Sequence, residues 1–557
     1  MTTPPEALDP DAPMIPPASE EPDGPGISST GKLVRSSAIV GMGTMLSRVT
    51  GMLRTLVAAF VLGGAVLADG YNLANTTPNM VYDLLLGGIL SATLVPIFVA
   101  QFERRDRRGT DAVVTVLVAA MVTFTVVAII AAPWIFRIYT WSAKPGERAE
   151  LISVGVPLLR WFLPQILFYG FTALATALLN ARRDYAAAAF APVLNNVVVL
   201  CILGAFWLVQ VRHHGVPSAT AVAHDPKLLT LLGAGTTAGI VAMTAVLWPA
   251  MRRCGIRLRW RFEWRHPAVR KVFGLSGWTL AYAVVNQVAL AIVLALASRR
   301  DGDVTAYTYA FIFFQLPYGL FAVSLMTTIV PELSSFVARA DVAGFRRSFA
   351  LGLRMLLLVM VPASIGAAVL AHPIVSALLE HANYRKSAHT TGDLLLLFSL
   401  GLIGYSVYLY AMRVFYALRD TRTPFVLNVI ENAINVGLAV VFVYVWHLNA
   451  QGLALAYAIA YSIAACFALA ATHRRMVHFD GRQTVSGSAR IVVAGAAMGL
   501  AVAAVVRVIG PQHGFRALVP TVAGIATGAA VYGALVVLLQ VQEVNLLLAR
   551  LRRRRAG

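Results

Sequence analysis

Residues 37–61 read Ser37-Ala-Ile-Val-Gly-Met-Gly-Thr-Met-Leu-Ser-Arg-Val-Thr-Gly-Met-Leu-Arg-Thr-Leu-Val-Ala-Ala-Phe-Val61, which is long and apolar enough to cross a bilayer as one helix. Two arginines, Arg48 and Arg54, interrupt it. An arginine near the bilayer centre costs roughly 2.5–3.5 kcal/mol on insertion scales, so such residues normally face a protein interior or a water-filled cavity. Guanidinium groups bind phosphate through paired hydrogen bonds. The stretch therefore predicts a membrane protein with an anion-binding cavity.

The composition of the rest of the chain supports a polytopic membrane protein. Of 557 residues, 58% are hydrophobic and 13% are charged, whereas a soluble domain has about 25% charged residues. Long apolar runs recur from residue 37 to residue 540, which predicts helices rather than the short alternating strands of a barrel. The net charge of +20 comes from arginines clustered between these runs. That distribution is a topology signal and gives no reason to expect nucleic acid as a partner.

We predict an all-α fold with about fourteen transmembrane helices from the length and apolarity of these runs. The expected spans are 37–63, 71–101, 112–135, 152–180, 187–210, 229–250, 272–298, 306–335, 349–371, 392–418, 424–446, 451–472, 489–509 and 517–540.

Alternate connections between the spans are rich in arginine. With the N-terminus inside, one side of the membrane holds roughly 30 lysines and arginines and the other side roughly 9, so both termini are predicted to be cytoplasmic. The arginine-rich segments are 103–110, 181–185, 252–271, 339–347, 419–423, 473–490 and 550–555.

The domain organisation is predicted to be two bundles of six spans followed by two further helices. Prolines support internal repetition, because an interior proline precedes a Val-Pro pair in both the second and the eighth span (Pro78 and Pro96; Pro317 and Pro331). Such paired, interrupted helices are typical of alternating-access transporters. The predicted segments are a disordered cytoplasmic tail (1–31), an N-lobe (32–251), a basic linker (252–271), a C-lobe (272–475), two C-terminal helices (476–545) and a basic tail (546–557).

The linker reads Arg252-Arg-Cys-Gly-Ile-Arg-Leu-Arg-Trp-Arg-Phe-Glu-Trp-Arg265. A basic segment beside a membrane favours contact with anionic lipid headgroups, and regulation by a partner protein is the alternative.

No pattern of covalent chemistry is visible in the sequence. It has no glycine-rich nucleotide loop, and we predict no catalytic residues, no metal site and no cofactor. His213 and His214 are adjacent but have no further ligand nearby in sequence, so they predict a solvated pair. The chain is therefore predicted to be a transporter rather than an enzyme.

Several motifs resemble the MurJ/MviN family of lipid II flippases, within the multidrug/oligosaccharidyl-lipid/polysaccharide exporter superfamily. Their order and spacing match over roughly residues 35–475. The motifs are Ser47-Arg-Val-Thr-Gly-Met-Leu-Arg54, Ala68-Asp69, Pro78-Asn79, Ser91-Ala-Thr-Leu-Val-Pro-Ile-Phe98, Ala175-Thr-Ala-Leu-Leu-Asn-Ala-Arg182, Phe190-Ala-Pro-Val-Leu-Asn195, Leu316-Pro-Tyr-Gly319 and Phe415-Tyr-Ala-Leu-Arg-Asp-Thr-Arg-Thr-Pro424.

The resemblance implies two six-helix lobes in a V around a central cavity, with the last two helices forming a groove for an undecaprenyl tail. It implies a bacterial cytoplasmic-membrane protein that moves lipid II from the inner to the outer leaflet, with cell-wall synthesis proteins as possible partners. Lipid II carries a diphosphate-linked disaccharide-pentapeptide, and such a headgroup needs a hydrated cationic path through hydrocarbon.

The predicted substrate-binding residues combine the resemblance with polar positions inside spans. Arg48 and Arg54 match the family's cavity arginines, and they share a cavity if the first helix breaks near Gly51. The alternative for them is a structural ion pair with Asp69 or Asp83. Asp69 matches the family's acidic position, with a helix N-cap as the alternative. Asn75, Asn79 and Asp83 recur every four residues on one face of the second span, where helix–helix hydrogen bonding is the alternative. Asn286, with Gln287 beside it, and Gln315 are the candidates in the second half.

The chain departs from the family pattern at several positions. Thr55 stands where many members carry Asp, and Tyr82 and Asp83 stand where a pair of basic residues is common. Phe311 and Ile312 replace an Asp-Arg pair. Three alternatives stay open: a flippase for another polyprenyl-diphosphate-linked glycan, a drug/cation antiporter of the same superfamily, and a membrane glycosyltransferase that uses lipid II. The buried arginines argue against cationic substrates, and the outer-loop carboxylates Asp225, Asp301 and Asp303 form no catalytic constellation.

Overall fold

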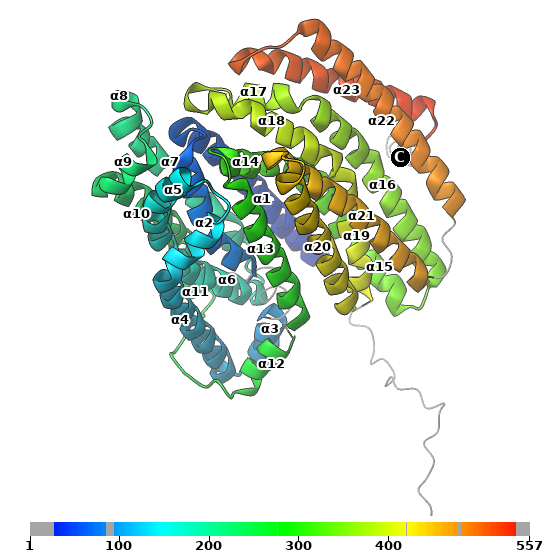
Figure 1. Ribbon diagram of the computed structural model, residues 1–557. Helices are drawn as coiled ribbons and strands as arrows, with labels where there is room; N and C mark the ends of the chain where they lie inside the picture. The colour runs from blue at the N-terminus through cyan, green and yellow to red at the C-terminus, as the bar shows by residue number, and fades with distance from the viewer. Residues whose placement is uncertain (1–26, 85–93, 276, 419, 477–480, 542–557) are drawn as a thin grey trace, which may run out of the picture.

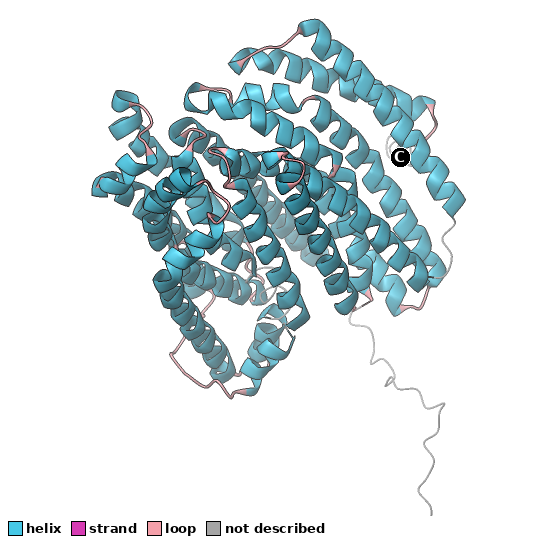
Figure 2. Cartoon of the chain, in the orientation of Figure 1, coloured by secondary structure: helices cyan, strands magenta, loops and turns pink. Residues whose placement is uncertain are grey.

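The computed structural model describes residues 27–84, 94–275, 277–418, 420–476 and 481–541, and these residues form helices and connecting loops without a strand (Figure 2). Among them, 12 helices are long and apolar enough to span a membrane, or 13 if the pair Arg385–Leu400 and Leu402–Ala417, bent by 47°, counts as one span. The predicted number of fourteen is not confirmed, because the expected second span includes residues 85–93, which lie outside the described residues. The all-helical membrane fold is confirmed.

Helices α1–α11 precede the basic linker, and we call them the N-half. They are α1 (Ile27–Leu62), α2 (Val66–Leu84), α3 (Val95–Glu103), α4 (Arg107–Tyr139), α5 (Pro145–Phe162), α6 (Gln165–Ala181), α7 (Ala186–Phe206), α8 (Arg212–His214), α9 (Ala219–His224), α10 (Pro226–Ala245) and α11 (Leu247–Arg253).

Helices α12–α21 form the C-half, and α22 and α23 follow it. Their bounds are α12 (Pro267–Leu275), α13 (Gly277–Ala297), α14 (Asp303–Pro317), α15 (Val323–Ala338), α16 (Val342–Val369), α17 (Ala371–Leu379), α18 (Arg385–Leu400), α19 (Leu402–Ala417), α20 (Arg422–Tyr444), α21 (Asn449–Met476), α22 (Gly481–Ile509) and α23 (Leu518–Leu538).

Figure 1 shows most N-half helices, in blue to teal, on one side of the molecule and most C-half helices, in green to gold, on the other, whereas α12 lies beside α3 and α4. Helices α22 and α23 lie outermost and pack on the C-half through α16. Gly495 and Gly499 of α22 face Ile365 so closely that a Cβ at either position would overlap its side chain. Small residues allow this approach of two membrane helices. The hydroxyl of Tyr532 on α23 donates to the Leu358 carbonyl at 2.7 Å and ties the pair to α16.

Helix α1 is continuous through Gly51, so the break that would have aimed both arginines at one cavity is absent. It begins at Ile27, inside the segment expected as a disordered tail. The side-chain amide of Asn196 on α7 donates to the Ser47 carbonyl at 3.1 Å and to the Thr50 hydroxyl at 3.0 Å. These two bonds hold the middle of α1 against α7.

The four prolines of the repeated pattern lie inside helices or at their ends. Pro317 ends α14 and is followed by a π-helical turn, Tyr318–Ala322, before α15 begins. Proline has no N–H to donate to the preceding turn, and π-turns often mark functional sites. Pro78 lies inside α2, and Pro96 lies in the first turn of α3. The eighth span is therefore interrupted as the repeated pattern predicted, whereas residues 85–93 of the second span lie outside the described residues.

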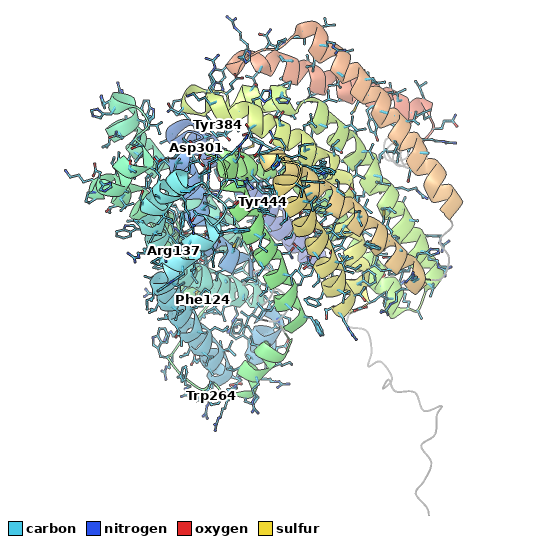
Figure 3. The ribbon with its side chains drawn as sticks, viewed as in Figure 1. Phe124, Arg137, Trp264, Asp301, Tyr384 and Tyr444 are labelled. Atoms are coloured by element: carbon cyan, nitrogen blue, oxygen red, sulfur yellow. The ribbon has the colours of Figure 1, made fainter. Side chains whose placement is uncertain are left out.

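The basic linker folds back along the start of α4. Its backbone N–H groups at Arg259 and Arg261 donate to Asp111 and Thr115, at 3.1 and 2.9 Å. Segments 103–110 and 252–271 therefore share one end of the molecule. Figure 3 places Trp264 of the linker at this end and Asp301 and Tyr384 at the opposite end.

Candidate functional site

Arg48 reaches from α1 in the N-half to the π-turn of the C-half. Its guanidinium group contacts Gly319, where a Cβ would overlap Nη1 of the arginine. Only glycine leaves this space, which gives a physical reason for the Leu316-Pro-Tyr-Gly319 sequence. Arg48 remains exposed despite this contact. It therefore lies on the surface where the two halves face each other.

Arg54 points elsewhere, since six residues turn a continuous helix by about 600°, or about 120° from the direction of Arg48. It is half-buried and close enough to interact electrostatically with the hydroxyl groups of Tyr71, Tyr169 and Tyr309. These tyrosines come from α2, α6 and α14, so Arg54 also lies where helices of both halves converge. The phenols offer a polar surrounding for a cation inside the membrane.

The predicted polar face of α2 meets both halves. Asn79 accepts a hydrogen bond from the Tyr169 hydroxyl at 2.7 Å, within the N-half. The side chain of Asp83 lies close to that of Gln287 on α13, in the C-half. Asn75 is half-buried on the same face. Like Arg48, Asp83 is therefore in contact with the opposite half.

Asp69 joins the start of α2 to the start of α14. Its Oδ1 accepts hydrogen bonds from the backbone N–H and the hydroxyl of Thr305, at 2.8 and 2.6 Å, and its Oδ2 accepts from the Gly302 N–H at 2.8 Å. Its side chain is 1% exposed. Gly302 is the N-cap of α14 and has a left-handed backbone (φ +84°). Asp69 thus caps a helix of the opposite half, whereas the sequence alone suggested either substrate contact or a cap of its own helix.

We call the set Asp69, Gly302 and Thr305 the Asp69 gate. Two further bonds join the halves beside it. The Ser387 hydroxyl of α18 donates to the Gly64 carbonyl at 2.8 Å, and the Asn383 amide donates to the Phe60 carbonyl at 3.1 Å. The two halves are therefore joined at this end, which is opposite to the linker.

Asp301, in the loop before α14, adds negative charge beside the gate. Burial, together with the nearby carboxylates of Glu147 and Glu150, raises its pKa from 3.8 to about 6. Both glutamates lie on α5 of the N-half. Carboxylates of the two halves thus lie together at this end.

The C-half contains a buried polar stripe on α20 that we did not predict. Asn428, Glu431, Asn432 and Asn435 are at most 7% exposed, and their i, i+3, i+4, i+7 spacing is a sequence signal that could have revealed them. Asn286 of α13, a predicted site residue, accepts from the amides of Asn428 and Asn432 at 3.1 and 3.2 Å. The structure therefore places Asn286 in a helix–helix contact.

Other polar residues of the C-half surround the π-turn. Gln315 is exposed and lies close to the Tyr405 hydroxyl. Arg413 of α19, which the sequence did not single out, lies close to the Tyr318 hydroxyl. Its signal was an arginine inside the apolar run 392–418. A cation of the C-half thus lies near the turn that Arg48 contacts.

Phe311 occupies one of the positions of the family's charged pair and belongs to an aromatic cluster. Its ring lies 5.6 Å from the ring centres of both Phe398 and Tyr457 and 5.7 Å from that of Phe314. Ile312 is partly buried against the same core. Aromatic packing therefore fills this part of the C-half.

The expected solvated pair His213 and His214 has ring centres 6.4 Å apart. Among the described residues, a different group, His372, His389 and Asp393, is the set of three side chains close enough to hold a metal ion.

The family model described as lipid II flippase MurJ matches residues 58–524 of the chain. The chain is also similar to a protein of Haemophilus influenzae (strain ATCC 51907 / DSM 11121 / KW20 / Rd) named "Probable lipid II flippase MurJ". The two are 27% identical over 530 residues, which cover 90% of this chain and 99% of the relative.

Solved structures share the fold. One described as "Lipid II flippase MurJ, inward closed conformation" covers 90% of this chain and 98% of its own, with a TM-score of 0.73 at 21% identity. An inward-facing multidrug resistance MATE transporter of the MOP superfamily covers 77% and 94%, with a TM-score of 0.62 at 13% identity.

Proposed function

The chain belongs to the MurJ family of lipid II flippases, and from this premise we propose that it moves lipid II across the membrane by alternately opening its two ends. It is a multi-pass inner-membrane protein, and lipid II is its substrate. The observation that carries the mechanism is the position of Arg48 and Arg54. Both arginines of α1 lie where the two halves face each other, one on the π-turn and one among tyrosines of three helices.

These arginines supply the chemistry that a diphosphate needs. A headgroup with two phosphates loses its hydration on entering the membrane, and charge-assisted hydrogen bonds from guanidinium groups replace it. Asn75, Asn79 and Gln315 add neutral polar groups for the sugars and peptide, and Arg413 adds a second-half cation. Asp69 and Asp83 have the same sign of charge as phosphate. They fit contacts between the halves, where Asp69 already accepts hydrogen bonds and Asp83 lies beside Gln287, better than contacts with the cargo.

The Asp69 gate fits one of the two ends of such a cycle. With the linker and the arginine-rich loops in the cytoplasm, the joined end faces outward and the cargo enters from inside. Separation of the halves at the Asp69 gate would then release lipid II to the outer leaflet. The linker, with exposed Trp260, Phe262 and Trp264 between arginines, fits contact with anionic headgroups on the cytoplasmic side.

The test is growth of a bacterium depleted of its own lipid II flippase and supplied with this chain. We expect the native chain to restore growth and Arg48→Ala or Arg54→Ala to abolish it, because each removes charge-assisted hydrogen bonds worth about 1.5–3 kcal/mol. Lysine at either position should rescue only in part, since paired contact to phosphate is lost. Arg137→Ala is the control, as Arg137 is an exposed arginine near the end of α4.

Native mass spectrometry separates the alternatives. Lipid II should bind the native protein and bind at least tenfold more weakly to both alanine variants. Normal growth with both variants would show that the arginines are structural. Binding of another polyprenyl-diphosphate glycan in preference to lipid II would favour the second flippase reading, and resistance to cationic drugs would favour the antiporter reading.

A further inference from the structure

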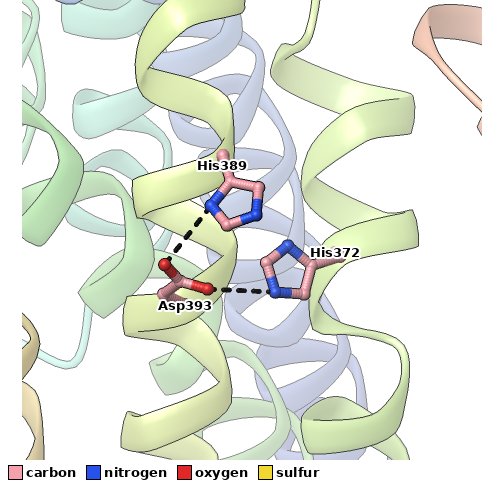
Figure 4. A group of neighbouring side chains, drawn as sticks. All are labelled: His372, His389 and Asp393. Atoms are coloured by element: carbon pink, nitrogen blue, oxygen red, sulfur yellow. Dashed lines mark ion pairs between the residues drawn. The ribbon is translucent and has the colours of Figure 1, made fainter.

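Three metal-binding side chains meet at the gate end of the C-half. His372 lies in the first turn of α17, and His389 and Asp393 lie one turn apart on α18 (Figure 4). Nε2 of His372 is 3.2 Å from Oδ1 of Asp393, and Nδ1 of His389 is 3.3 Å from Oδ2. The two imidazoles thus approach one carboxylate from two different helices.

The spacing fits a tetrahedral zinc ion. Zinc binds imidazole nitrogen and carboxylate oxygen at about 2.0–2.2 Å, so two ligand atoms of a tetrahedral site lie about 3.3–3.5 Å apart. The two nitrogen–oxygen distances already match this separation between ligand atoms. All three ligand atoms lie within 4.8 Å of one another. Small side-chain rotations would bring all three onto one ion. Imidazole and carboxylate are ligands that zinc shares with other divalent transition metals.

The surroundings orient two of the ligands. Gly392 lies directly beneath the His372 ring, and a Cβ there would lie 2.5 Å from Nδ1 of that ring. Gln451 of α21 donates a hydrogen bond to Oδ2 of Asp393 at 3.4 Å. Partners outside the ligand set commonly fix the orientation of metal ligands in this way.

The site is open to the aqueous side. The side chains of His372, His389 and Asp393 are 40%, 80% and 30% exposed. An ion could reach them without crossing the core, and water would complete its coordination.

We propose that His372, His389 and Asp393 form a binding site for a divalent transition-metal ion of the zinc class. The ion bridges α17 to α18, two helices joined by a sharp corner that includes Asn383. Asn383 in that corner is hydrogen-bonded to Phe60 of the N-half, and Ser387 in the first turn of α18 is hydrogen-bonded to Gly64 of the N-half. A bound ion therefore stiffens the C-half side of the joined end.

The binding experiment uses the full-length protein in detergent, stripped with EDTA and carrying no polyhistidine tag. Zinc titrated against a chromophoric competitor should bind with one strong site per chain, and magnesium, which prefers oxygen ligands, should not compete. His372→Ala, His389→Ala and Asp393→Asn should each weaken zinc binding at least tenfold. The matched control is His213→Ala with His214→Ala, which removes two exposed imidazoles at the same end of the molecule and should leave binding unchanged.

Hydrogen exchange provides a second readout that does not depend on transport. Zinc should slow exchange of backbone amides in 371–393 of the native protein and not of the Asp393→Asn variant. Gly392→Ala should weaken zinc binding by displacing the His372 ring while the circular dichroism spectrum stays native. Unchanged zinc affinity in all three ligand variants, or equal loss in the His213/His214 control, would overturn the proposal.

Discussion

At the scale of single residues, Asp69 shows how a buried carboxylate can hold two halves of a transporter together. Its two oxygens accept three hydrogen bonds from the first turn of α14, at 2.6–2.8 Å. A negative charge is also favourable beside a helix N-terminus, where the backbone N–H groups lack partners. Gly302, the N-cap of α14, has no side chain that could accept hydrogen bonds from the first turn of α14. The carboxylate of Asp69 accepts them instead.

We expect Asp69→Asn to weaken the joined state without unfolding the protein. The amide keeps the shape of the side chain, but its NH₂ group faces an N–H donor of Gly302 or Thr305 and can accept no bond there. Losing one such bond costs about 1–3 kcal/mol, which moves the population of separated halves by about fivefold to over a hundredfold. Spin labels at Gly146 of α5 and Lys386 of α18, in a background without Cys201, Cys254 and Cys466, report the separation.

The native distance distribution should be dominated by a single short distance, and the variant should add a longer one. Asn72, which donates to the Thr305 hydroxyl at 3.0 Å, provides the comparison. Asn72→Ala removes a neutral hydrogen bond and should shift the distribution less than Asp69→Asn. An Asp69→Asn distribution identical to the native one would contradict a gating role.

At the scale of elements, the π-turn after Pro317 is where the N-half and C-half meet in the middle of the molecule. The turn presents Gly319 to the guanidinium of Arg48 and Tyr318 to that of Arg413. A helix distorted by proline is thereby used to position two cations from different halves.

Gly319→Ala should reduce lipid II binding with little effect on folding. The new methyl group would overlap the Arg48 guanidinium, the flexible end of a long side chain, so Arg48 moves and the helix does not. We expect a threefold to tenfold loss of lipid II affinity by native mass spectrometry, about 0.7–1.4 kcal/mol. Gly437→Ala on α20 is the control, because nothing lies within 4 Å of a Cβ there. Equal affinity in the two alanine variants would show that the position of Arg48 is unimportant.

Sequence predicted the elements better than their contacts. Apolar length located the spans, since burial in lipid demands about 20 apolar residues whatever the packing, and 489–509 lies within α22 as expected. It did not predict the continuity of α1, because glycine permits a break without requiring one. It also left the partners of Asp69 and Asn286 open. Those partners are 233 and 142 residues away in the chain, and no local pattern specifies which helices will be neighbours.

At the scale of the whole molecule, the two halves are joined at the end opposite the linker. Arg108 and Glu263 form two 3.0 Å hydrogen bonds at the linker end, holding the linker to α4 of the N-half. At the gate end, hydrogen bonds from Asp69, Asn383 and Ser387 join the two halves directly. Because the two ends differ, the orientation of the chain in the membrane determines on which side lipid II would be released.

Single cysteines should establish that orientation in a cysteine-free background. Cysteines at exposed positions of the gate end, Gly146, Thr220 and Lys386, should react with an impermeant thiol reagent added to intact cells. The loops on that side contain few basic residues and are therefore expected to lie outside the cell. Arg105 and Phe262 at the linker end should react only after the cells are opened. Reaction of Phe262→Cys in intact cells would reverse the proposed topology.

The joined state should also be favoured by acid. The pKa of Asp301 is raised to about 6 beside Glu147 and Glu150 of the opposite half, so the joined state binds a proton more tightly than the separated one. Lowering the pH through about 6 therefore stabilises the joined state, and raising it weakens that state. Because Asp301 is exposed and screened, the change between pH 7.5 and 5.5 should be no more than a few-fold.

The same pair of spin labels at Gly146 and Lys386 measures this effect. Asp301→Asn should remove the pH dependence and leave the joined state populated at both pH values. A shift toward longer distances at low pH in the native protein would contradict the predicted sign.

The buried carboxylate of Asp69 also ties the gate to hydration. When the halves separate, the hydrogen bonds from the N–H groups of Gly302 and Thr305 to the Asp69 carboxylate break. Water that enters the gap must then form hydrogen bonds with these groups. Opening is therefore a wetting event, and its equilibrium depends on water activity. Large solutes that are excluded from the gap draw water out of it, so high concentrations of such an osmolyte should hold the native protein shut. The dependence of the distance distribution on osmolyte concentration would then give the number of water molecules taken up when the halves separate.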